Sequence, residues 1–504
     1  MASQQVVRLD SFYARVEKGG EVFVPPDSCY ARWRRASVDA FLLKDSPRHP
    51  FPEKLLQMIW AHQRLKRDSL FGSSGERITV LHPGFWNREA GPDFQKAVVQ
   101  IGEGRPRSGD IEIDLDSQGW LHHGHDKNPK YRRVILHIVW SRSSSNSNPC
   151  PVPTLSLEGC LDSPIEELRQ WLLDAPACPP LIAGKCTAPL QDLPPDALHE
   201  ILRQAAEIRF QLKAHEFLAL AKTSGWDQAL WEGLFTSLGY KQNPWPMRRL
   251  AELKPRWHPD AALDDRPSIK DFQRRLLGIS GLIPNDPGKL PRSAAEYTQE
   301  LWQGWWRERN LFEEVSIPPE AWQWNGIRPA NHPQRRIALA AHWLADATFI
   351  PRLETWIETP TDVAKLNSSL LTILTPQEDV FWNRHWTLRS RAMDEPKPLL
   401  GPDRTTDIAM NVLLPWAWIR ARLGHNDRLQ NAILSRYLEF PAGSTNTVMR
   451  LAQNRLFAGK TSAFERKAAL QQGVHQIVRD FCNTTDAVCT HCRFPELVRS
   501  LGRK

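Results

Sequence analysis

Residues 91–116 read GPDFQKAVVQIGEGRPRSGDIEIDLD and predict a β-hairpin whose second strand carries an acidic face. In that strand Ile111, Ile113 and Leu115 alternate with acidic residues, so one face would be buried and the other lined with carboxylates. The acidic side chains are those of Asp110, Glu112, Asp114 and Asp116. Carboxylates this close repel one another unless water solvates them. A divalent metal with oxygen ligands is the simplest cation that would neutralise the face.

The sequence around the hairpin predicts a helix, three strands, a connection and a further strand. The helix begins after Pro52, where apolar residues recur at helical spacing. The last strand is almost continuously apolar, as expected for a strand covered on both faces. Residues 149–156 predict an additional edge strand. The five main elements are expected at residues 52–67, 77–81, 94–101, 109–115 and 133–140.

From about residue 192 onward the pattern is helical. Several segments up to residue 481 carry apolar residues three and four positions apart, and Pro-rich links separate them. The whole chain would then be an α+β protein. We expect an N-terminal arm, an α/β core, a large mainly α-helical region and a C-terminal cysteine segment, at residues 1–50, 51–180, 190–481 and 482–504.

Composition and charge limit the classes of protein that fit. A chain of 504 residues exceeds one hydrophobic core, so we expect two or three domains. Its 41% hydrophobic and 24% charged residues are typical of a folded chain rather than a disordered one. The net charge of +8 is compatible with a polyanionic partner. Because no apolar run reaches the length of a signal peptide or a membrane span, we expect a cytoplasmic protein without membrane contact.

The predicted order of elements resembles the PD-(D/E)XK nuclease core, a restriction-endonuclease-like αβββαβ arrangement with a mixed sheet. In that core an aspartate opens the second strand and a Glu-x-Lys motif lies on the third. Asp93 matches the first carboxylate and Glu112 the second, whereas Asp114 stands where the lysine should be. That lysine normally helps to orient or activate the attacking water, so its replacement is the main departure from the nuclease pattern.

The nuclease resemblance implies a metal site and a nucleic-acid substrate. Asp93, Glu112 and the main-chain carbonyl of Ile113 would hold Mg²⁺ or Mn²⁺, completed by water and phosphate oxygens. Asp114 would take a second metal, or it would bind the counterion of an inactive site. The expected partner is DNA or RNA.

Residues near the acidic strand supply further candidates. His123 and His125 would shuttle a proton, because an imidazole titrates near neutral pH. The basic segments 328–336 and 384–391 would grip phosphates, and their tryptophan neighbours would stack on unpaired bases. The nearest basic substitutes for the missing lysine are Lys96, Lys127 and Lys130. The candidate substrate-binding residues are Asn87, Trp120, Lys127, Tyr131, Arg328 and Asn331.

Strand pleating sets a condition for this site. In a regular hairpin Asp93 and Glu112 share a face only if paired residue numbers sum to an odd value, and a bulge would relax the condition. The alternative interpretation is that Asp93 caps a turn after Pro92 and that the acidic residues are the solvated outer face of an edge hairpin. His137, in an apolar strand, is expected to be a hydrogen-bonded core histidine.

A second resemblance covers nearly the whole chain. The sequence is identified as a member of a bacterial family, domain of unknown function 2851, and this likeness transfers no established activity. The residues that match lie in the segments Gly84 to Asn87, Gly91 to Phe94, Gly109 to Glu112, Trp120 to His125, Tyr131, Leu136 to Val139, Leu238 to Asn243, Arg328 to Pro333, Asn411 to Pro415 and the terminal cysteines.

The C-terminal cysteines are candidates for a second metal site. The spacing of Cys482, Cys489 and Cys492 resembles part of the pattern in iron-sulfur DNA glycosylases. Three thiols would need a fourth ligand to hold zinc or a cluster. The candidates for that ligand are His491, His475, Cys29 and Cys186. The alternative is that these cysteines are reduced and unligated.

Three functional hypotheses follow. The leading one is a metal-dependent phosphodiesterase that acts on DNA or RNA, with the helical region binding substrate. The second is a catalytically inactive nucleic-acid-binding or scaffold protein with a degenerate nuclease core, which the missing lysine favours. The third is a hydrolase of another class that uses the His/Asp cluster around a metal.

Overall fold

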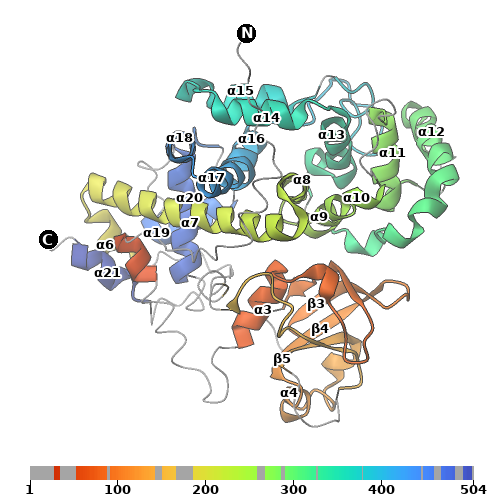
Figure 1. Cartoon of the computed structure of the whole chain (residues 1–504), viewed down its shortest axis with the longest axis horizontal. Coiled ribbons are helices and arrows are strands. Elements are labelled where there is room, and N and C mark those ends of the chain that lie inside the picture. The colour runs from red at the N-terminus through yellow and green to blue at the C-terminus, as the bar shows by residue number, and fades with distance from the viewer. Residues whose placement is uncertain are drawn as a thin grey trace.

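The computed structural model combines an N-terminal β-sheet with a large helical region, so the chain is α+β as predicted (Figure 1). The sheet and its covering elements form one lobe, and most of the helices form the other. The structure describes residues 28–34, 53–87, 91–141, 150–165, 168, 185–257, 267–284, 286, 290–324, 327–376, 378–443, 447–458, 467–482 and 492–501.

The sheet is mixed and has six strands, in the order β1-β3-β4-β5-β6 with β2 paired to β3. The pairs β1–β3, β2–β3 and β3–β4 are antiparallel, whereas β4–β5 and β5–β6 are parallel. The predicted element order is confirmed, including the added edge strand β6, except that the two-residue strand β2 was not predicted. The elements are α3 (Glu53–His62), β1 (Ile78–His82), β2 (Phe85–Trp86), β3 (Phe94–Ile101), β4 (Arg107–Asp116), α4 (Gly119–His122), β5 (Val134–Ser141) and β6 (Thr154–Ser156).

The β3–β4 hairpin contains a bulge that sets its register. Phe94 pairs with Ile111, but further along Ala97 pairs with Gly109, so the register shifts between these pairs. Lys96 lies at the shift with a φ of 56° and donates its main-chain N–H to Asp110 Oδ1 at 3.1 Å. The numbers 94 and 111 have an odd sum, so at this end of the hairpin the condition for Asp93 and Glu112 to share a face is met.

One face of the sheet packs on α3 and belongs to a large apolar core. Leu56 and Ile59 of α3 are fully buried, and so are Ile111 and Ile113 of β4. These residues are apolar at helical spacing on α3 and at alternate positions on β4, which is why the two elements meet along these faces. The acidic positions of β4 therefore point to the opposite face.

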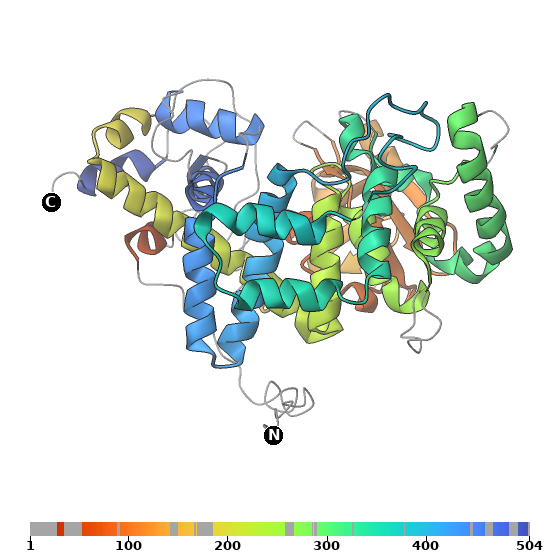
Figure 2. The ribbon, with the colours of Figure 1, turned by 90° about the horizontal axis from the view of Figure 1, so that it is seen from above.

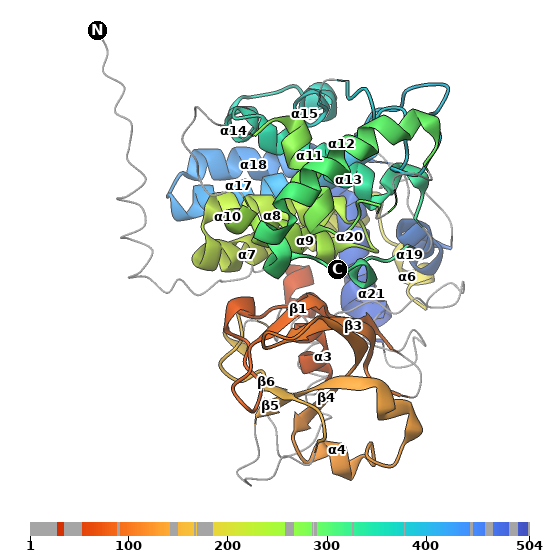
Figure 3. The ribbon, with the colours of Figure 1, turned by 90° about the vertical axis from the view of Figure 1, so that its right-hand side faces the viewer.

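The opposite face of the sheet is covered by a small second layer. This layer is α4 with the 3-10 helix η2 (Pro129–Arg133), and Trp120 packs there with Val134 and Cys150. In Figures 1 and 3, α4 lies at the end of the sheet lobe farthest from the helical region. The acidic face of β4 is thus covered rather than open to water.

The helical region is built around α7, a helix of 30 residues that contributes buried side chains to both main cores. Ile201 and Leu202 join the core of the sheet lobe, and Phe210 and Phe217 join the core of the other helices. Seen from above, the C-terminal helices and α12 lie at opposite ends of the molecule (Figure 2). The helices are α6 (Thr187–Gln191), α7 (Pro195–Ser224), α8 (Trp226–Leu238), α9 (Pro244–Glu252), α10 (Lys254–Trp257), α11 (Ile269–Ile279), α12 (Arg292–Glu308), α13 (Pro333–Ala345), α14 (Phe349–Glu358), α15 (Leu366–Leu374), α16 (Pro402–Ile408), α17 (Leu414–Leu423), α18 (Asp427–Glu439), α19 (Thr447–Phe457), α20 (Ala468–Ile477) and α21 (Phe494–Leu501).

Within the predicted N-terminal arm, residues 29–34 are helical and dock near the end of α20. Tyr30 is fully buried and its hydroxyl donates to Asp480 Oδ2 at 2.6 Å. Arg34 Nε lies 3.1 Å from the other carboxylate oxygen of Asp480. In the described part of the chain, no helix is both long enough and apolar enough to span a membrane.

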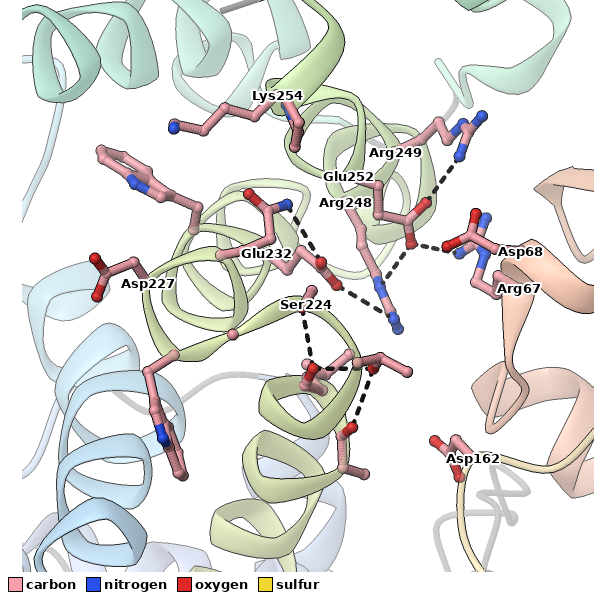
Figure 4. A pocket seen from close by; sticks show the side chains of 18 of the residues that line it. Arg67, Asp68, Asp162, Ser224, Asp227, Glu232, Arg248, Arg249, Glu252 and Lys254 are labelled. Carbon is pink, nitrogen blue, oxygen red and sulfur yellow. Dashed lines mark hydrogen bonds and ion pairs between the residues drawn. The ribbon is translucent and has the colours of Figure 1, made fainter. Parts of the chain in front are cut away.

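A cavity of about 1020 Å³ lies where the sheet lobe meets the helices (Figure 4). Arg67, from the sheet lobe, and Arg248, from α9, place guanidinium nitrogens 3.1 Å from Glu252 Oε1. Arg248 also lies 3.4 Å from Glu232 of α8. The residues that line the cavity come from both lobes and do not include the acidic strand, so the cavity is a junction between the lobes and is separate from the acidic face. The charged side chains named here neutralise one another.

Candidate metal centre

Three carboxylates converge where β3 begins beside β4. The main-chain N–H of Asp93 donates to Glu112 Oε2 at 3.1 Å, and the main-chain N–H of Ile113 donates to Asp93 Oδ2 at 3.1 Å. Gln57 of α3 donates its side-chain amide to Asp93 Oδ1 at 2.9 Å. These bonds hold Asp93 and Glu112 together across the hairpin, and Asp114 follows two residues later on the same face of β4.

Glu112 and Asp114 are buried and Asp93 is half-buried, and this burial disfavours their charge. Glu112 is 6% exposed and Asp114 is 1% exposed. Burial, then the neighbouring charges of Asp93 and Asp114, raises the pKa of Glu112 well above its usual range. Burial, then the charge of Glu53, also raises the pKa of Asp93. A bound cation would reverse this penalty, so the donor set fits a metal.

The solvated-edge interpretation of the acidic strand is wrong. β4 is an interior strand, and Asp110, Glu112 and Asp114 are all buried. The four acidic residues also differ in function. Asp110 accepts the bond from the bulge, and Asp116 Oδ1 accepts main-chain N–H bonds of 2.8 and 3.2 Å at the start of α4. Only Glu112 and Asp114 contribute to the convergent cluster.

Three imidazoles face these carboxylates. His125 Nε2 lies 3.0 Å from Glu112 Oε1, and His123 Nδ1 lies 2.9 Å from Asp114 Oδ1. His137 Nε2 is hydrogen-bonded to Asp114 Oδ2 at 2.9 Å. One ligand atom from each of Asp114, His123 and His125 falls within 4.8 Å of the other two.

Two of these close approaches are not hydrogen bonds. Asp114 Oδ1 lies 2.9 Å from His123 Nδ1, and His125 Nε2 lies 3.0 Å from Glu112 Oε1. Among the described residues, however, neither Asp114 Oδ1 nor His125 Nε2 has a partner in hydrogen-bond geometry. Buried polar atoms without partners are costly in native proteins, and a bound cation would remove this cost. One ligand atom of Asp114 and one of His125 lie within 4.8 Å of each other, so a cation bound between the two residues would satisfy both.

The short helix α4 carries the histidines to β4 because it packs without a side chain at Gly119. A Cβ on Gly119 would lie 2.5 Å from Asp114 Cγ, closer than any real contact. Asp116 accepts the first main-chain N–H groups of the helix, which fixes its start. The close packing at Gly119 and the hydrogen bonds to Asp116 together let the segment after α4 bring His123 and His125 back over β4.

Aromatic rings fix the imidazole planes. Tyr131 stacks on His125 with centroids 4.0 Å apart and planes at 25°. Trp120 meets His125 and His137 edge-on, each at 5.5 Å. Burial lowers the pKa of His125, which favours the neutral imidazole that binds metals. Burial and the charge of Glu112 raise the pKa of the Tyr131 phenol, so this hydroxyl stays protonated.

The predicted site residues fall into two groups in space. Most of the candidates near the acidic strand cluster on it: Asp93, Glu112, Asp114, Trp120, His123, His125 and Tyr131. Asn87 bonds the main chain of Asp93 and Pro92, so it shapes the turn before β3. Lys127 is exposed in the segment after His125. Arg328 and Asn331 lie beside α13 in the helical region, away from this cluster.

Two site residues were not predicted from the sequence. His137 is a buried, hydrogen-bonded histidine as expected, yet its partner is Asp114 and it faces the cluster. The parallel register pairs His137 with Glu112, and knowledge of that pairing would have placed it there. Gln57 was also missed, although its spacing from Glu53 marks a polar pair on an apolar helix.

Two basic residues predicted to grip phosphates are structural. Arg335 is fully buried and donates to the carbonyl oxygens of Lys397 and Pro398. Arg336 is also buried and donates to the carbonyls of Leu399 and Ala330. Their guanidinium groups therefore fasten the segment before α16 to α13, and they do not face a solvent-borne phosphate.

The C-terminal cysteine site lies largely outside the described residues. Cys489 and the side chain of Cys482 belong to the part of the chain that is not described. Cys492 is half-buried, with its thiol 3.8 Å from the carbonyl oxygen of Phe481. The zinc or iron-sulfur hypothesis for these three cysteines stays a prediction.

Comparison with known proteins gives one match. A family model described as "Protein of unknown function (DUF2851)" matches residues 53–446, which include the acidic hairpin, the histidines and most of the helical region. No curated protein and no solved structure matches the chain.

Proposed function

The chain belongs to the DUF2851 family of proteins of unknown function, and we propose that its activity is the metal-dependent hydrolysis of phosphodiester bonds in DNA or RNA. The observation that carries the proposal is the joint placement of Asp93 and Glu112 by the register of the β3–β4 hairpin. This pair lies in a helix, three-strand, connection and strand arrangement that resembles the nuclease core.

The residues present suit a hard divalent cation. Asp93, Glu112 and the carbonyl of Ile113 would hold Mg²⁺ or Mn²⁺, both of which prefer oxygen ligands. Such an ion supplies a bound water of lowered pKa and neutralises charge on the phosphate. Gln57 would keep Asp93 oriented, since its amide already occupies one carboxylate oxygen.

Substrate approach falls to residues at the edge of the acidic cluster. The side chain of His123 is 53% exposed and touches Asp114, so it lies where the cluster meets solvent. Lys127 and Lys130 are exposed on the segment that follows. Their charges would favour the approach of a polyanion to a site that is otherwise acidic.

A non-catalytic nucleic-acid-binding or scaffold protein is the second candidate. The observation that favours it is that Asp114 stands where the nuclease pattern has lysine. Asp114 is 1% exposed and is hydrogen-bonded to His137. Without a lysine, the orientation of the attacking water would depend on other groups. In this case the protein would bind nucleic acid without cleaving it.

A cleavage assay separates the two functions. Labelled single- and double-stranded DNA and RNA would be incubated with the protein under Mg²⁺, under Mn²⁺ and under a chelator. Cleavage that needs the metal and disappears in Asp93→Asn and Glu112→Gln supports the phosphodiesterase. Glu103→Gln is the matched control, because Glu103 is exposed at the turn of the same hairpin. Binding without cleavage in any metal would favour the scaffold.

A further inference from the structure

We propose that Asp114, His123 and His125 form a second metal centre, which binds a borderline-soft transition ion such as Zn²⁺ or Co²⁺ in preference to Mg²⁺. The centre rests on the proposed function only for its role in hydrolysis, where the ion would supply the positive charge that lysine supplies in the nuclease core. Binding of the ion itself follows from the donor atoms and their placement.

The donor set selects the class of ion. Two imidazole nitrogens and one carboxylate oxygen suit zinc and neighbouring first-row metals, whereas Mg²⁺ and Ca²⁺ are bound through oxygen. Three protein ligands leave one tetrahedral position open for water, as in catalytic rather than structural zinc sites. The composition of this cluster therefore differs from that of the all-oxygen site at Asp93 and Glu112.

The geometry is close to that of a bound ion. Ligands about 2.1 Å from a tetrahedral ion lie about 3.4 Å from one another. The ligand atoms of the three residues lie within 4.8 Å, and His123 Nδ1 is 2.9 Å from Asp114 Oδ1. His123 is the exposed member of the set, so its side chain is free to move by the small distance that brings the three ligand atoms to the spacing of a bound ion. The buried Asp114 Oδ1 and His125 Nε2 have no hydrogen-bond partner among the described residues.

Surrounding residues hold two of the ligands in place. His137 occupies Asp114 Oδ2 at 2.9 Å and leaves Oδ1 for the ion. Tyr131 stacks on the ring of His125 and limits its rotation. Such outer partners orient ligands and raise metal affinity. His137 is thus a positioning residue of the centre.

The second centre adjoins the first through Glu112. His125 Nε2 lies 3.0 Å from Glu112 Oε1, while the other oxygen of Glu112 accepts the N–H of Asp93. Two-metal phosphoryl-transfer sites hold their ions about 3.5–4 Å apart. A carboxylate between the two ligand sets is placed to bridge such a pair.

Cobalt spectroscopy tests this centre without any substrate. Chelator-treated full-length protein would be titrated with Co²⁺, whose visible absorption reports nitrogen ligands and low coordination number. We expect one Co²⁺ with imidazole-ligated absorption that excess Mg²⁺ does not displace. His123→Ala should weaken binding by at least about tenfold, since the loss of an outer partner alone costs about 10–100-fold. His122→Ala, a neighbouring exposed histidine, should leave the titration unchanged.

Further variants separate this inference from the proposed function. Asp114→Asn should also lose the cobalt absorption, and Asp93→Asn should keep it. Weak absorption typical of six oxygen ligands, or an unchanged titration in His123→Ala, would overturn the centre. If cobalt binds as expected but no nucleic acid is cleaved, the centre stands and the phosphodiesterase proposal fails. If cleavage depends on Asp93 while His123→Ala alters neither cobalt absorption nor rate, only the centre fails.

Discussion

Asp93 and Glu112 are joined across the β3–β4 hairpin, because the main-chain N–H of Asp93 donates to Glu112 Oε2 at 3.1 Å. The bond exists because Phe94 pairs with Ile111, which aligns Asp93 with Glu112 on one face. The register shift that follows, at Lys96, lets the rest of the hairpin pair differently. The metal site therefore depends on a local irregularity in an otherwise regular sheet.

The bulge should be sensitive to the residue at position 96. Lys96 has a φ of 56°, a left-handed conformation that already costs an ordinary L-residue about 1–2 kcal/mol and is less accessible still to a β-branched residue. We expect Lys96→Ile to lower the free energy of unfolding, and Lys96→Gly to change it little, because glycine removes this strain but adds backbone entropy to the unfolded chain. Urea unfolding measures both. The control is Gln95→Ile, because Gln95 is the exposed neighbouring residue and does not have a left-handed backbone. An equal loss of stability in Gln95→Ile would show that the backbone conformation at the bulge is not the cause.

Gly119 should be required for the histidine cluster. A Cβ at this position would lie 2.5 Å from Asp114 Cγ, so Gly119→Ala must push α4 away from β4. Over-packing of this kind costs about 1–3 kcal/mol. We expect a lowered melting temperature together with loss of the cobalt absorption. Gly401→Ala, which has open space around its Cβ, is the control. Normal cobalt binding by Gly119→Ala would show that α4 does not position the ligands.

Bound metal should stabilise the fold through the buried carboxylates. Burial raises the pKa of both Asp93 and Glu112, so their charged forms destabilise the metal-free protein. Mn²⁺ at about 100 times its dissociation constant would add about 2.7 kcal/mol. We expect this gain in wild type, measured by urea unfolding, and its loss in Glu112→Gln. Without metal, Glu112→Gln should be at least as stable as wild type. A less stable metal-free variant would contradict this electrostatic account.

Stability should fall in acid through half-buried histidines outside the site. Burial lowers the pKa of His475 to about 3, and burial with nearby positive charge lowers that of His62 to about 3. The unfolded chain protonates near pH 6.5 whereas the folded protein does not, so stability is full above 6.5 and falls from there towards pH 3. Each group contributes at most about 1.4 kcal/mol per pH unit. Unfolding free energies measured across this range should show a shallower slope in His475→Gln than in wild type or in His122→Gln.

The hairpin and the element order could be predicted because both depend on local patterns. Alternation identified β4, and apolar spacing identified α3. A condition on register decides whether Asp93 and Glu112 share a face, and the observed pairing of Phe94 with Ile111 meets it. The separate functions of Asp110 and Asp116 could not be predicted, because they depend on the left-handed backbone at Lys96 and on the start of a four-residue helix.

Long-range pairing explains the remaining misses. His137 read as a core histidine because its strand is apolar, and only the parallel register with β4 brings it to Asp114. Arg335 and Arg336 resembled phosphate ligands in sequence. They are buried because the distant segment at residues 397–399 supplies carbonyl acceptors, a contact that no local pattern encodes.

The most direct test of the account is the position of a metal on the acidic face. Crystals of the full chain soaked in Mn²⁺ would be measured for anomalous scattering at the manganese edge. We expect a peak within bonding distance of both Asp93 and Glu112, which disappears in Glu112→Gln. An anomalous map with no peak between these two carboxylates, at a Mn²⁺ concentration that fills other sites, would contradict the central claim.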